Sequence, residues 1–211
     1  MKNLIIVGAG EFGLEVFGWL EHAQGYNTKW RFKGFIDYNA DALNQIPFCN
    51  FPVLNNENDY AIDVDDIFVC SIANTKVKAK VVAVITGRGG IFTNVIHHSV
   101  IFFKNINLGI GAIISPNCVI SNNCKIGNHV ALNLACTIGH DVEIGDFCQI
   151  SSQCDLTGHV KLGDSVFIGS SSCIIPKVKV GSNVIIGAGS VVIKNIKDDQ
   201  SVFGNPAKNI M

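Results

Sequence analysis

Aliphatic side chains occupy every sixth position over much of the second half of the chain. The series starts at Leu108, ends at Val192 and has isoleucine, leucine or valine at all fifteen positions. A period of six fits neither the helical repeat of about 3.6 residues nor the alternation of a half-buried strand. The repeating unit must therefore be one flat face of a larger coil, which predicts a parallel β-helix of hexapeptide repeats.

A second position in each repeat supports this fold. Four residues after each aliphatic side chain stands a small or β-branched one, as at Cys118, Val130 and Ser172. One large and one small inward side chain per repeat would fill a narrow prism, and three faces of six residues would make one coil. The alternative is a β-sandwich in which the spacing is accidental.

The first part of the chain shows short apolar strands that alternate with helical stretches. We expect strands at Leu4–Val7, Phe32–Ile36 and Ile67–Ile72, with helices at Leu14–Ala23 and Val77–Ile85. This alternation is typical of a parallel sheet with helices packed on it, and its length suits one half of a doubly wound fold. The prediction is an α/β domain with a half-Rossmann parallel sheet.

The predicted domain boundary follows a glycine-rich linker at Thr86–Gly90. Residues 1–90 then form the α/β domain and residues 91–211 the β-helix, with Phe92–Ile96 as a strand that leads into the first coil. After Val192 the spacing of six stops. We expect this tail, which contains Gly204-Asn205-Pro206, to pack along the prism without continuing it.

Composition limits the possible partners and the compartment. The chain has 211 residues, 48% hydrophobic content and a formal net charge of −1, so it lacks the positive charge typical of a nucleic-acid-binding protein. It has no apolar run as long as a membrane span, and it opens directly into a strand at Leu4–Val7 without a signal-peptide pattern. We expect a soluble cytoplasmic protein without membrane insertion.

Most cysteines fall on the small inward position of the repeat, where a thiol acts as a small hydrophobic group. The five are Cys118, Cys124, Cys136, Cys148 and Cys154. No C-x-x-C pair occurs, so packing is favoured over metal ligation.

The first turn reads G-x-G-x-x-G between a predicted strand and a predicted helix. Phosphates can sit on backbone N–H groups at such a helix N-terminus, and an acidic residue that ends the next strand can take a nucleoside hydroxyl or base edge. The alternatives are an NAD site, which a domain of this size hardly accommodates, and a purely structural glycine turn. The predicted ligand-binding residues are Gly8, Gly10, Glu11, Phe12, Gly13 and Asp37.

Asn74 and Lys78 follow the third strand at the same carboxyl edge, so both could contact that ligand. The alternative is a helix N-cap for Asn74 and a solvated lysine for Lys78.

His140 is an unusual choice among the outward residues of the repeat, which are mostly Asn, Asp, Ser and Lys. An imidazole suits general-base chemistry, and Asp141 beside it could hold its tautomer if a corner of the coil brings the two side chains together. One coil on, Gly158 could offer its N–H above His140, and His159 would stack over Asp141. The alternative is an inert surface histidine.

Some hexapeptide β-helices hold zinc through two histidines that are five residues apart. Residues five positions after His129, His140 and His159 are not histidines, so we expect no metal cofactor.

With these residues in hand, the chain resembles the bacterial sugar O-/N-acetyltransferases that join a nucleotide-binding domain to a left-handed parallel β-helix. This group includes bacillosamine-pathway nucleotide-amino-sugar N-acetyltransferases and sialic-acid O-acetyltransferases. The resemblance covers essentially the full length. It rests on Gly8–Gly13, Gly34–Asp37, Ile96-His97, Asn133, Gly139–Asp146, Ile186–Val192 and Gly204–Lys208.

The resemblance implies acetyl-CoA as co-substrate, a homotrimer with active sites between subunits, and a nucleotide-sugar acceptor. It implies that His140 is the general base with Asp141 as its partner, that Asp37 binds the base of the nucleotide, and that Asn133 contacts substrate. Residues implied along the CoA path are Gly158, Gly169, Ser170, Gly187, Ala188 and Pro206.

The sequence departs from the family pattern at three positions. Gln149 replaces a second histidine found in some relatives, Gly139 replaces a glutamate before the base, and His98 stands where proline is common. The predicted activity is acetyl transfer from acetyl-CoA to the 4-amino group of a UDP-linked amino-sugar. The alternatives are O-acetylation of sialic acid or a related sugar, and a non-catalytic nucleotide-sugar-binding scaffold.

Overall fold

The computed structural model describes residues 1–44 and 46–210 and divides them into two compact units, one ending at Val95 and one beginning at Ile96. The expected boundary was after residue 90. The difference arises because Ile91-Phe92 still pairs with the sheet of the first unit.

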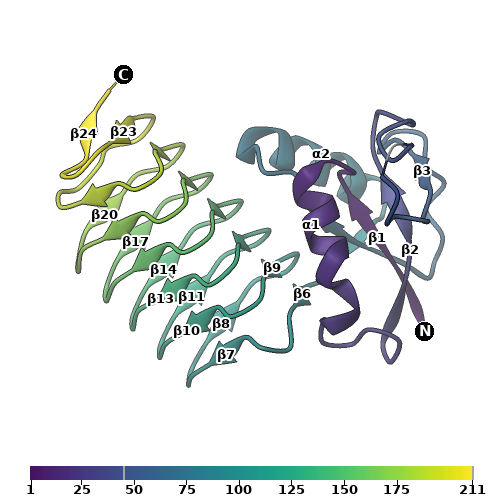
Figure 1. The fold of residues 1–211 in the computed structure, drawn as a ribbon, viewed down its shortest axis with the longest axis horizontal. Coiled ribbons are helices and arrows are strands. Elements are labelled where there is room, and N and C mark those ends of the chain that lie inside the picture. The colour runs from purple at the N-terminus through teal and green to yellow at the C-terminus, as the bar shows by residue number, and fades with distance from the viewer. Residues whose placement is uncertain (45, 211) are drawn as a thin grey trace. The chain divides into compact units, whose positions relative to one another are not determined.

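The first unit is a five-stranded, entirely parallel sheet in the order β3-β2-β1-β4-β5, with two helices (Figure 1). Its centre is fully buried, as parallel strands with covered faces require. This arrangement confirms the predicted half-Rossmann sheet. Its elements are β1 (Lys2–Val7), α1 (Glu11–Trp19), a 3₁₀ turn η1 (Leu20–His22), β2 (Trp30–Ile36), β3 (Val53–Asn55), β4 (Asp66–Cys70), α2 (Thr75–Gly87) and β5 (Ile91–Phe92).

An ion pair between a half-buried lysine and a buried aspartate lies at the N-terminal end of β4. Lys33 Nζ lies 2.8 Å from one oxygen of Asp66, and the Tyr60 hydroxyl donates to the other at 2.7 Å. Burial works to raise the pKa of Asp66, but the hydrogen bonds from Lys33, the Asp63 N–H and Tyr60 hold it below its ordinary value.

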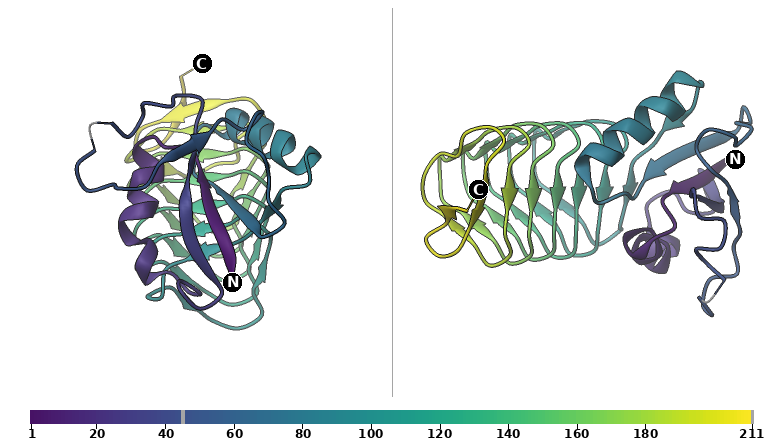
Figure 2. Two further views of the ribbon diagram at one scale, coloured as in Figure 1. Left: turned by 90° about the vertical axis from the view of Figure 1, so that its right-hand side faces the viewer. Right: turned by 90° about the horizontal axis from the view of Figure 1, so that it is seen from above.

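The second unit is a three-sided parallel β-helix whose coils stack along its axis (Figure 2). Strands one coil apart pair in parallel, so that Ile138 is in register with Ile120 before it and Leu156 after it. Each of the three faces is one sheet. The coil that contains His140 contributes one strand to each sheet, and we name the sheets after these strands: the β12, β13 and β14 sheets.

The β13 sheet contains β7 (Ile101–Phe102), β10 (Val119–Ile120), β13 (Thr137–Ile138), β16 (Asp155–Leu156), β19 (Cys173–Ile174) and β22 (Val191–Val192). The β14 sheet contains β8 (Asn107–Leu108), β11 (Lys125–Ile126), β14 (Glu143–Ile144), β17 (Lys161–Leu162) and β20 (Lys179–Val180). The β12 sheet contains β6 (Val95–Ile96), β9 (Ile113–Ile114), β12 (Ala131–Leu132), β15 (Gln149–Ile150), β18 (Phe167–Ile168), β21 (Ile185–Ile186), β23 (Ser201–Phe203) and β24 (Lys208–Asn209).

The corners of the coils use left-handed backbone. From Asn105 to Gly189 every sixth residue has a φ between 55° and 72°, and only two of these corner residues, Gly111 and Gly189, are glycines. L side chains rarely adopt this conformation, so the stacked hydrogen bonds between coils must hold the corners in place. The corner bonds are regular: the N–H of Asp141 donates to the Asn122 carbonyl one coil below, at 2.9 Å.

The interior matches the predicted register. The aliphatic positions after Leu108 are at most 5% exposed, and Leu108 itself, near the open end, is half-buried. The five inward cysteines are at most 1% exposed, which confirms their packing role.

The tail corrects one expectation. It does continue the prism, because Ile196 pairs with Val180 and Val202 with Ile186, in each case sixteen residues on (196 − 180 and 202 − 186). Ile196 and Val202 are both buried in the β-helix core. The last coil is two residues shorter than the others, so a strict spacing of six does not detect it.

Candidate active site

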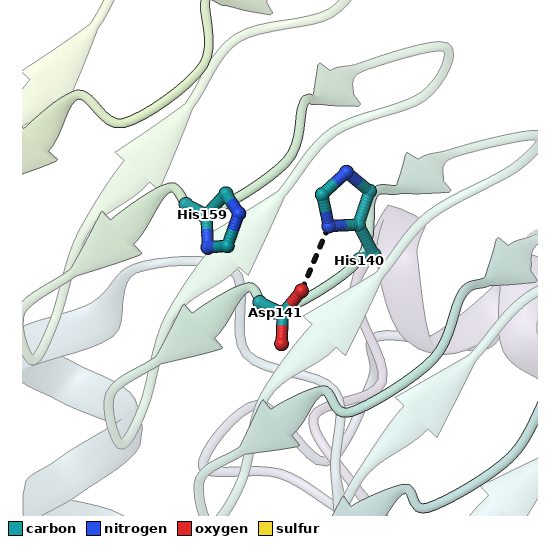
Figure 3. A group of neighbouring side chains, drawn as sticks. All are labelled: His140, Asp141 and His159. Atoms are coloured by element: carbon teal, nitrogen blue, oxygen red, sulfur yellow. Dashed lines mark hydrogen bonds and ion pairs between the residues drawn. The ribbon is translucent and has the colours of Figure 1, made fainter.

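His140 and Asp141 lie at one corner of the β-helix, between the β13 and β14 sheets; we call this column of corners the His140 edge. His140 Nδ1 lies 2.8 Å from Asp141 Oδ2 (Figure 3). Adjacent residues of a straight strand point to opposite faces. Here Asp141 has a φ of 59°, and this corner backbone brings the two side chains together.

The electrostatics favour an ionised Asp141. The hydrogen bond with His140 is the main cause that holds the pKa of Asp141 below its ordinary value, and the Asn123 side-chain amide donates to Oδ1 at 3.2 Å. A carboxylate at Nδ1 keeps the proton of a neutral imidazole on that nitrogen, which leaves Nε2 as a proton acceptor. The His140 side chain is 58% exposed, so a ligand can reach it.

Gly158 lies one coil above and touches the reactive end of the imidazole. A Cβ atom built on Gly158 would be 2.6 Å from His140 Nε2. Among the described residues no backbone carbonyl accepts a hydrogen bond from the Gly158 N–H, whereas the next N–H, that of His159, donates to the His140 carbonyl at 2.9 Å. The Gly158 amide is therefore available to a ligand that contacts Nε2.

His159 completes the group at this edge (Figure 3). Its ring centroid lies 4.9 Å from that of His140 with the ring planes nearly perpendicular, at 88°. A positive charge on His159 also contributes to the lowered pKa of Asp141. The sequence places His159 over Asp141 but does not indicate that the two imidazoles touch.

Apart from Gly158, the residues expected along the CoA path lie elsewhere. Gly169, Ser170, Gly187 and Ala188 follow strands of the β12 sheet, at corners that join it to the β13 sheet; we call this column the Gly187 edge. A Cβ on Gly169 would lie 2.5 Å from the Ala188 nitrogen, so these glycines allow close stacking of coils.

Asn133 and Pro206 were also predicted to contact ligands. Asn133 follows β12 on the Gly187 edge, and its side-chain oxygen accepts the Leu134 N–H at 2.8 Å. Pro206 is exposed in the turn between β23 and β24. Within one chain the fold does not bring the residues of the Gly187 edge together with His140.

The first unit contains a cavity of about 550 Å³ at the carboxyl ends of β1, β2 and β4. Its lining includes five of the predicted residues, namely Gly8, Gly10, Glu11, Phe12 and Asp37. Three acidic side chains, those of Glu11, Asp37 and Glu57, line it without a lysine or arginine.

The structure explains why glycine is required at two positions of the glycine turn. Gly8 has a φ of 104°, and a Cβ on Gly13 would lie 2.0 Å from the Gly8 carbonyl oxygen, so only glycine allows α1 to pack this closely on the turn. Gly13 is thus behind the cavity and does not line it. Asp37 anchors the turn, because its Oδ2 accepts the Ala9 N–H at 2.8 Å and its Oδ1 the Asn39 N–H at 2.9 Å.

Asn74 and Lys78 do not line the cavity either. The Asn74 side chain accepts the Val77 N–H at 3.0 Å and so caps α2, as its alternative interpretation held. Lys78 is fully buried, which contradicts the solvated lysine of the other alternative. Tyr38 and Glu57 also line the cavity, and neither could be predicted from the sequence because neither belongs to a recognisable motif.

Two family models match the chain. The PglD N-terminal domain matches residues 3–85, and the bacterial transferase hexapeptide (six repeats) matches residues 159–194. No curated relative matches the chain significantly by sequence.

Solved structures match its whole length. The acetyltransferase domain of PglB from Neisseria gonorrhoeae FA1090 is 25% identical, with 100% of both chains covered and a TM-score of 0.88, and it has also been solved in complex with acetyl coenzyme A. WeeI from Acinetobacter baumannii AYE gives the same values. The chain therefore combines a PglD N-terminal domain with hexapeptide repeats, and its full-length structural neighbours are sugar acetyltransferases of the left-handed β-helix type. This confirms the predicted family and enzyme class.

The fold of this acetyltransferase also matches PerB from Caulobacter crescentus in complex with CoA and GDP-perosamine. That structure is 22% identical, covers 100% of this chain and 98% of its own, and has a TM-score of 0.86. Among the described residues of the acetyltransferase, no helix is long and apolar enough to cross a membrane.

The structure places two of the residues at which this acetyltransferase departs from the family pattern, Gly139 and Gln149. Gly139 packs against the next coil, since a Cβ there would lie 2.7 Å from the Gly158 nitrogen. A glutamate at this position would require the coils to move apart. Gln149 is 3% exposed in β15, on a strand of the β12 sheet and away from the His140 edge of its own chain.

Proposed function

We propose that this acetyltransferase transfers the acetyl group of acetyl-CoA to the 4-amino group of a nucleotide-linked amino-sugar, with UDP as the nucleotide, and that His140 is the general base. The observation that carries the proposal is the His140–Asp141 pair, whose Nε2 lies against Gly158 of the next coil. Acetyl-CoA as co-substrate agrees with the PglB acetyltransferase domain, which has been solved with that molecule.

The reaction requires one proton to move. The amine nitrogen attacks the thioester carbonyl carbon, the carbon–sulfur bond breaks, and the products are the N-acetylated sugar and CoA. His140 Nε2 accepts the proton that the nitrogen loses, and the protonated imidazole then supplies a proton to the leaving sulfur. Asp141 holds the imidazole in place and stabilises its protonated form.

Gly158 has the second role at this edge. The tetrahedral intermediate carries negative charge on the former carbonyl oxygen, and a backbone N–H aimed at that oxygen stabilises it. The Gly158 N–H has no backbone acceptor among the described residues and belongs to the residue that lies against Nε2, so we assign it this role.

The cavity of the first unit is the proposed nucleotide site. The first N–H groups of α1 attract phosphates, and the Glu11, Asp37 and Glu57 carboxylates suit hydrogen-bond donors such as ribose hydroxyls and the imide N–H of a base. Each Asp37 oxygen already accepts one backbone N–H and retains a further lone pair for the base.

The active site is proposed to form between subunits of a homotrimer. His140 and the Gly187 edge are separate within one chain, so a neighbour whose Gly187 edge lies against the His140 edge would complete the site. Mixing His140→Ala chains with Ala188→Trp chains, each inactive alone, should restore part of the activity. A fully active monomer in light scattering would rule out the shared site.

The decisive experiment measures acetyl-CoA consumption with UDP-, GDP- and dTDP-linked 4-amino-sugars and with sialic acid. We expect transfer to a nucleotide amino-sugar, with a mass gain of one acetyl group on its nitrogen. His140→Ala should lower kcat by about two to four orders of magnitude without unfolding, the usual contribution of a general base. Transfer only to a sialic-acid hydroxyl would favour the O-acetyltransferase, and full activity of folded His140→Ala would refute the mechanism.

A further inference from the structure

We propose that His140, Asp141 and His159 together form a binding site for a borderline divalent transition metal ion such as Zn²⁺, and that the bound ion inhibits the enzyme. The inhibitory part rests on the proposed role of His140. The binding part rests only on the three side chains.

The donor atoms are already close. One nitrogen from each imidazole and one Asp141 oxygen all lie within 4.8 Å of one another, and His140 Nδ1 and Asp141 Oδ2 are 2.8 Å apart. Zinc bonds of about 2.0–2.2 Å in a tetrahedral site place ligand atoms about 3.3 Å apart. Small rotations of exposed side chains therefore suffice to bring the third ligand into range.

The backbone holds these side chains in position. His140 and Asp141 come from one coil and His159 from the next, and the two coils are joined by the hydrogen bond from the His159 N–H to the His140 carbonyl, 2.9 Å long. Asp141 and His159 both have corner backbone, with φ of 59° and 62°. A site built on such a rigid scaffold loses little backbone freedom when it binds an ion.

The donor set selects the class of ion. Two imidazoles and one carboxylate suit Zn²⁺ and its neighbours in the first transition series, whereas Mg²⁺ and Ca²⁺ prefer oxygen ligands only. The exposed position leaves a fourth ligand place for water. The spacing differs from the five-residue histidine pair of zinc-binding β-helices, because here a corner supplies two ligands and the coil above supplies the third.

The bound ion would inhibit the enzyme because it changes the tautomer of His140. When the ion occupies Nδ1 in place of its proton, a neutral imidazole carries its proton on Nε2. His140 then has no nitrogen that can accept a proton from the amine. The ion also occupies the Asp141 oxygen that holds the imidazole during catalysis.

The test uses Zn²⁺ alone on a chain without a polyhistidine tag, with binding followed by equilibrium dialysis and inhibition followed by acetyl-CoA consumption. The key variant is His159→Asn, because asparagine occupies the same corner conformation at Asn123 and Asn183. The matched control is His22→Asn, which removes another exposed histidine beside a carboxylate, 3.8 Å from Glu21. Circular dichroism checks that each variant is folded.

We expect micromolar Zn²⁺ to bind and inhibit the wild-type chain and His22→Asn equally, with Mg²⁺ inactive at the same concentration. His159→Asn should weaken both effects by at least about 10-fold, since even an outer-shell partner of a metal ligand contributes 10–100-fold to affinity. Equal Zn²⁺ binding by wild type and His159→Asn would overturn the site and leave the proposed function untouched. Binding that depends on His159 but leaves turnover unchanged would overturn the inhibition, whereas the role of His140 as the base is tested separately by the turnover of His140→Ala.

Discussion

Gly158→Ala tests the position of His140 without removing any functional group. The new methyl group would lie 2.6 Å from Nε2 and 2.8 Å from Cε1 of His140, whereas ordinary contacts begin at 3.4 Å. The ring must therefore recede by about 1 Å. The backbone at residue 158 is not left-handed, so alanine introduces no strain there, and it retains the N–H proposed to stabilise the oxyanion.

We expect a large catalytic effect and a small effect on stability. A reacting group misplaced by about 1 Å can cost up to 10²-fold in rate, so kcat should fall by about 10- to 100-fold, or about 1.4 to 2.7 kcal/mol of activation free energy. The melting temperature should change little, because the imidazole is the exposed end of a flexible side chain and can move aside.

Two other glycines provide the controls. Gly139→Ala would place its methyl group 2.7 Å from the Gly158 backbone nitrogen, which cannot move aside, so this variant should lower the melting temperature. Gly18→Ala, inside α1, meets nothing within 4 Å and should leave kcat unchanged, while the melting temperature should stay equal or rise because alanine favours a helix more than glycine does. Steady-state kinetics and thermal denaturation separate the cases. Wild-type kcat in a folded Gly158→Ala chain would refute the assigned position of the base.

Three further predictions concern the nucleotide site, the register and the ion pair. Asp37→Ala should raise the KM for the nucleotide sugar far more than that for acetyl-CoA. If calorimetry showed lost CoA binding and unchanged nucleotide-sugar binding, the assignment of the two ligands to their sites would be reversed. Ile150→Asp should abolish folding, since it would bury an unpaired carboxylate, whereas Asp146→Asn keeps an acceptor for its neighbour and should barely change the melting temperature. The lowered pKa of Asp66 stabilises the fold above the ordinary aspartate pKa of about 4, and this stabilisation is lost as pH falls through the lowered value. Asp66→Asn should thus destabilise the first unit at pH 6, and the loss should shrink as the pH is lowered below about 4. The fluorescence of the chain's two tryptophans, which both lie in that unit, follows unfolding, and a loss that stays constant as the pH falls would contradict this.

The sequence predicted most of the β-helix because one physical requirement recurs in every repeat. An inward aliphatic side chain such as Ile150 and a small partner such as Cys154 must fill the same narrow interior in each coil, so the register can be read from spacing alone. The last coil escaped this reasoning, since its inward residues Ile196 and Val202 follow a spacing shortened by two residues. The strand at Val53–Asn55 also escaped it, because three residues are too few to show a period.

The candidate site was likewise predicted only in part. The sequence by itself determined that His140 is an outward histidine beside an aspartate, and that a glycine turn lies between a strand and a helix. The 18-residue coil also placed Gly158 over His140 and His159 over Asp141. Only the tertiary structure decided that a left-handed corner joins the His140 and Asp141 side chains, that the His159 imidazole touches that of His140, and that Lys78 is buried. These contacts depend on how each corner turns its side chains and how the elements pack, and neither is a property of local sequence.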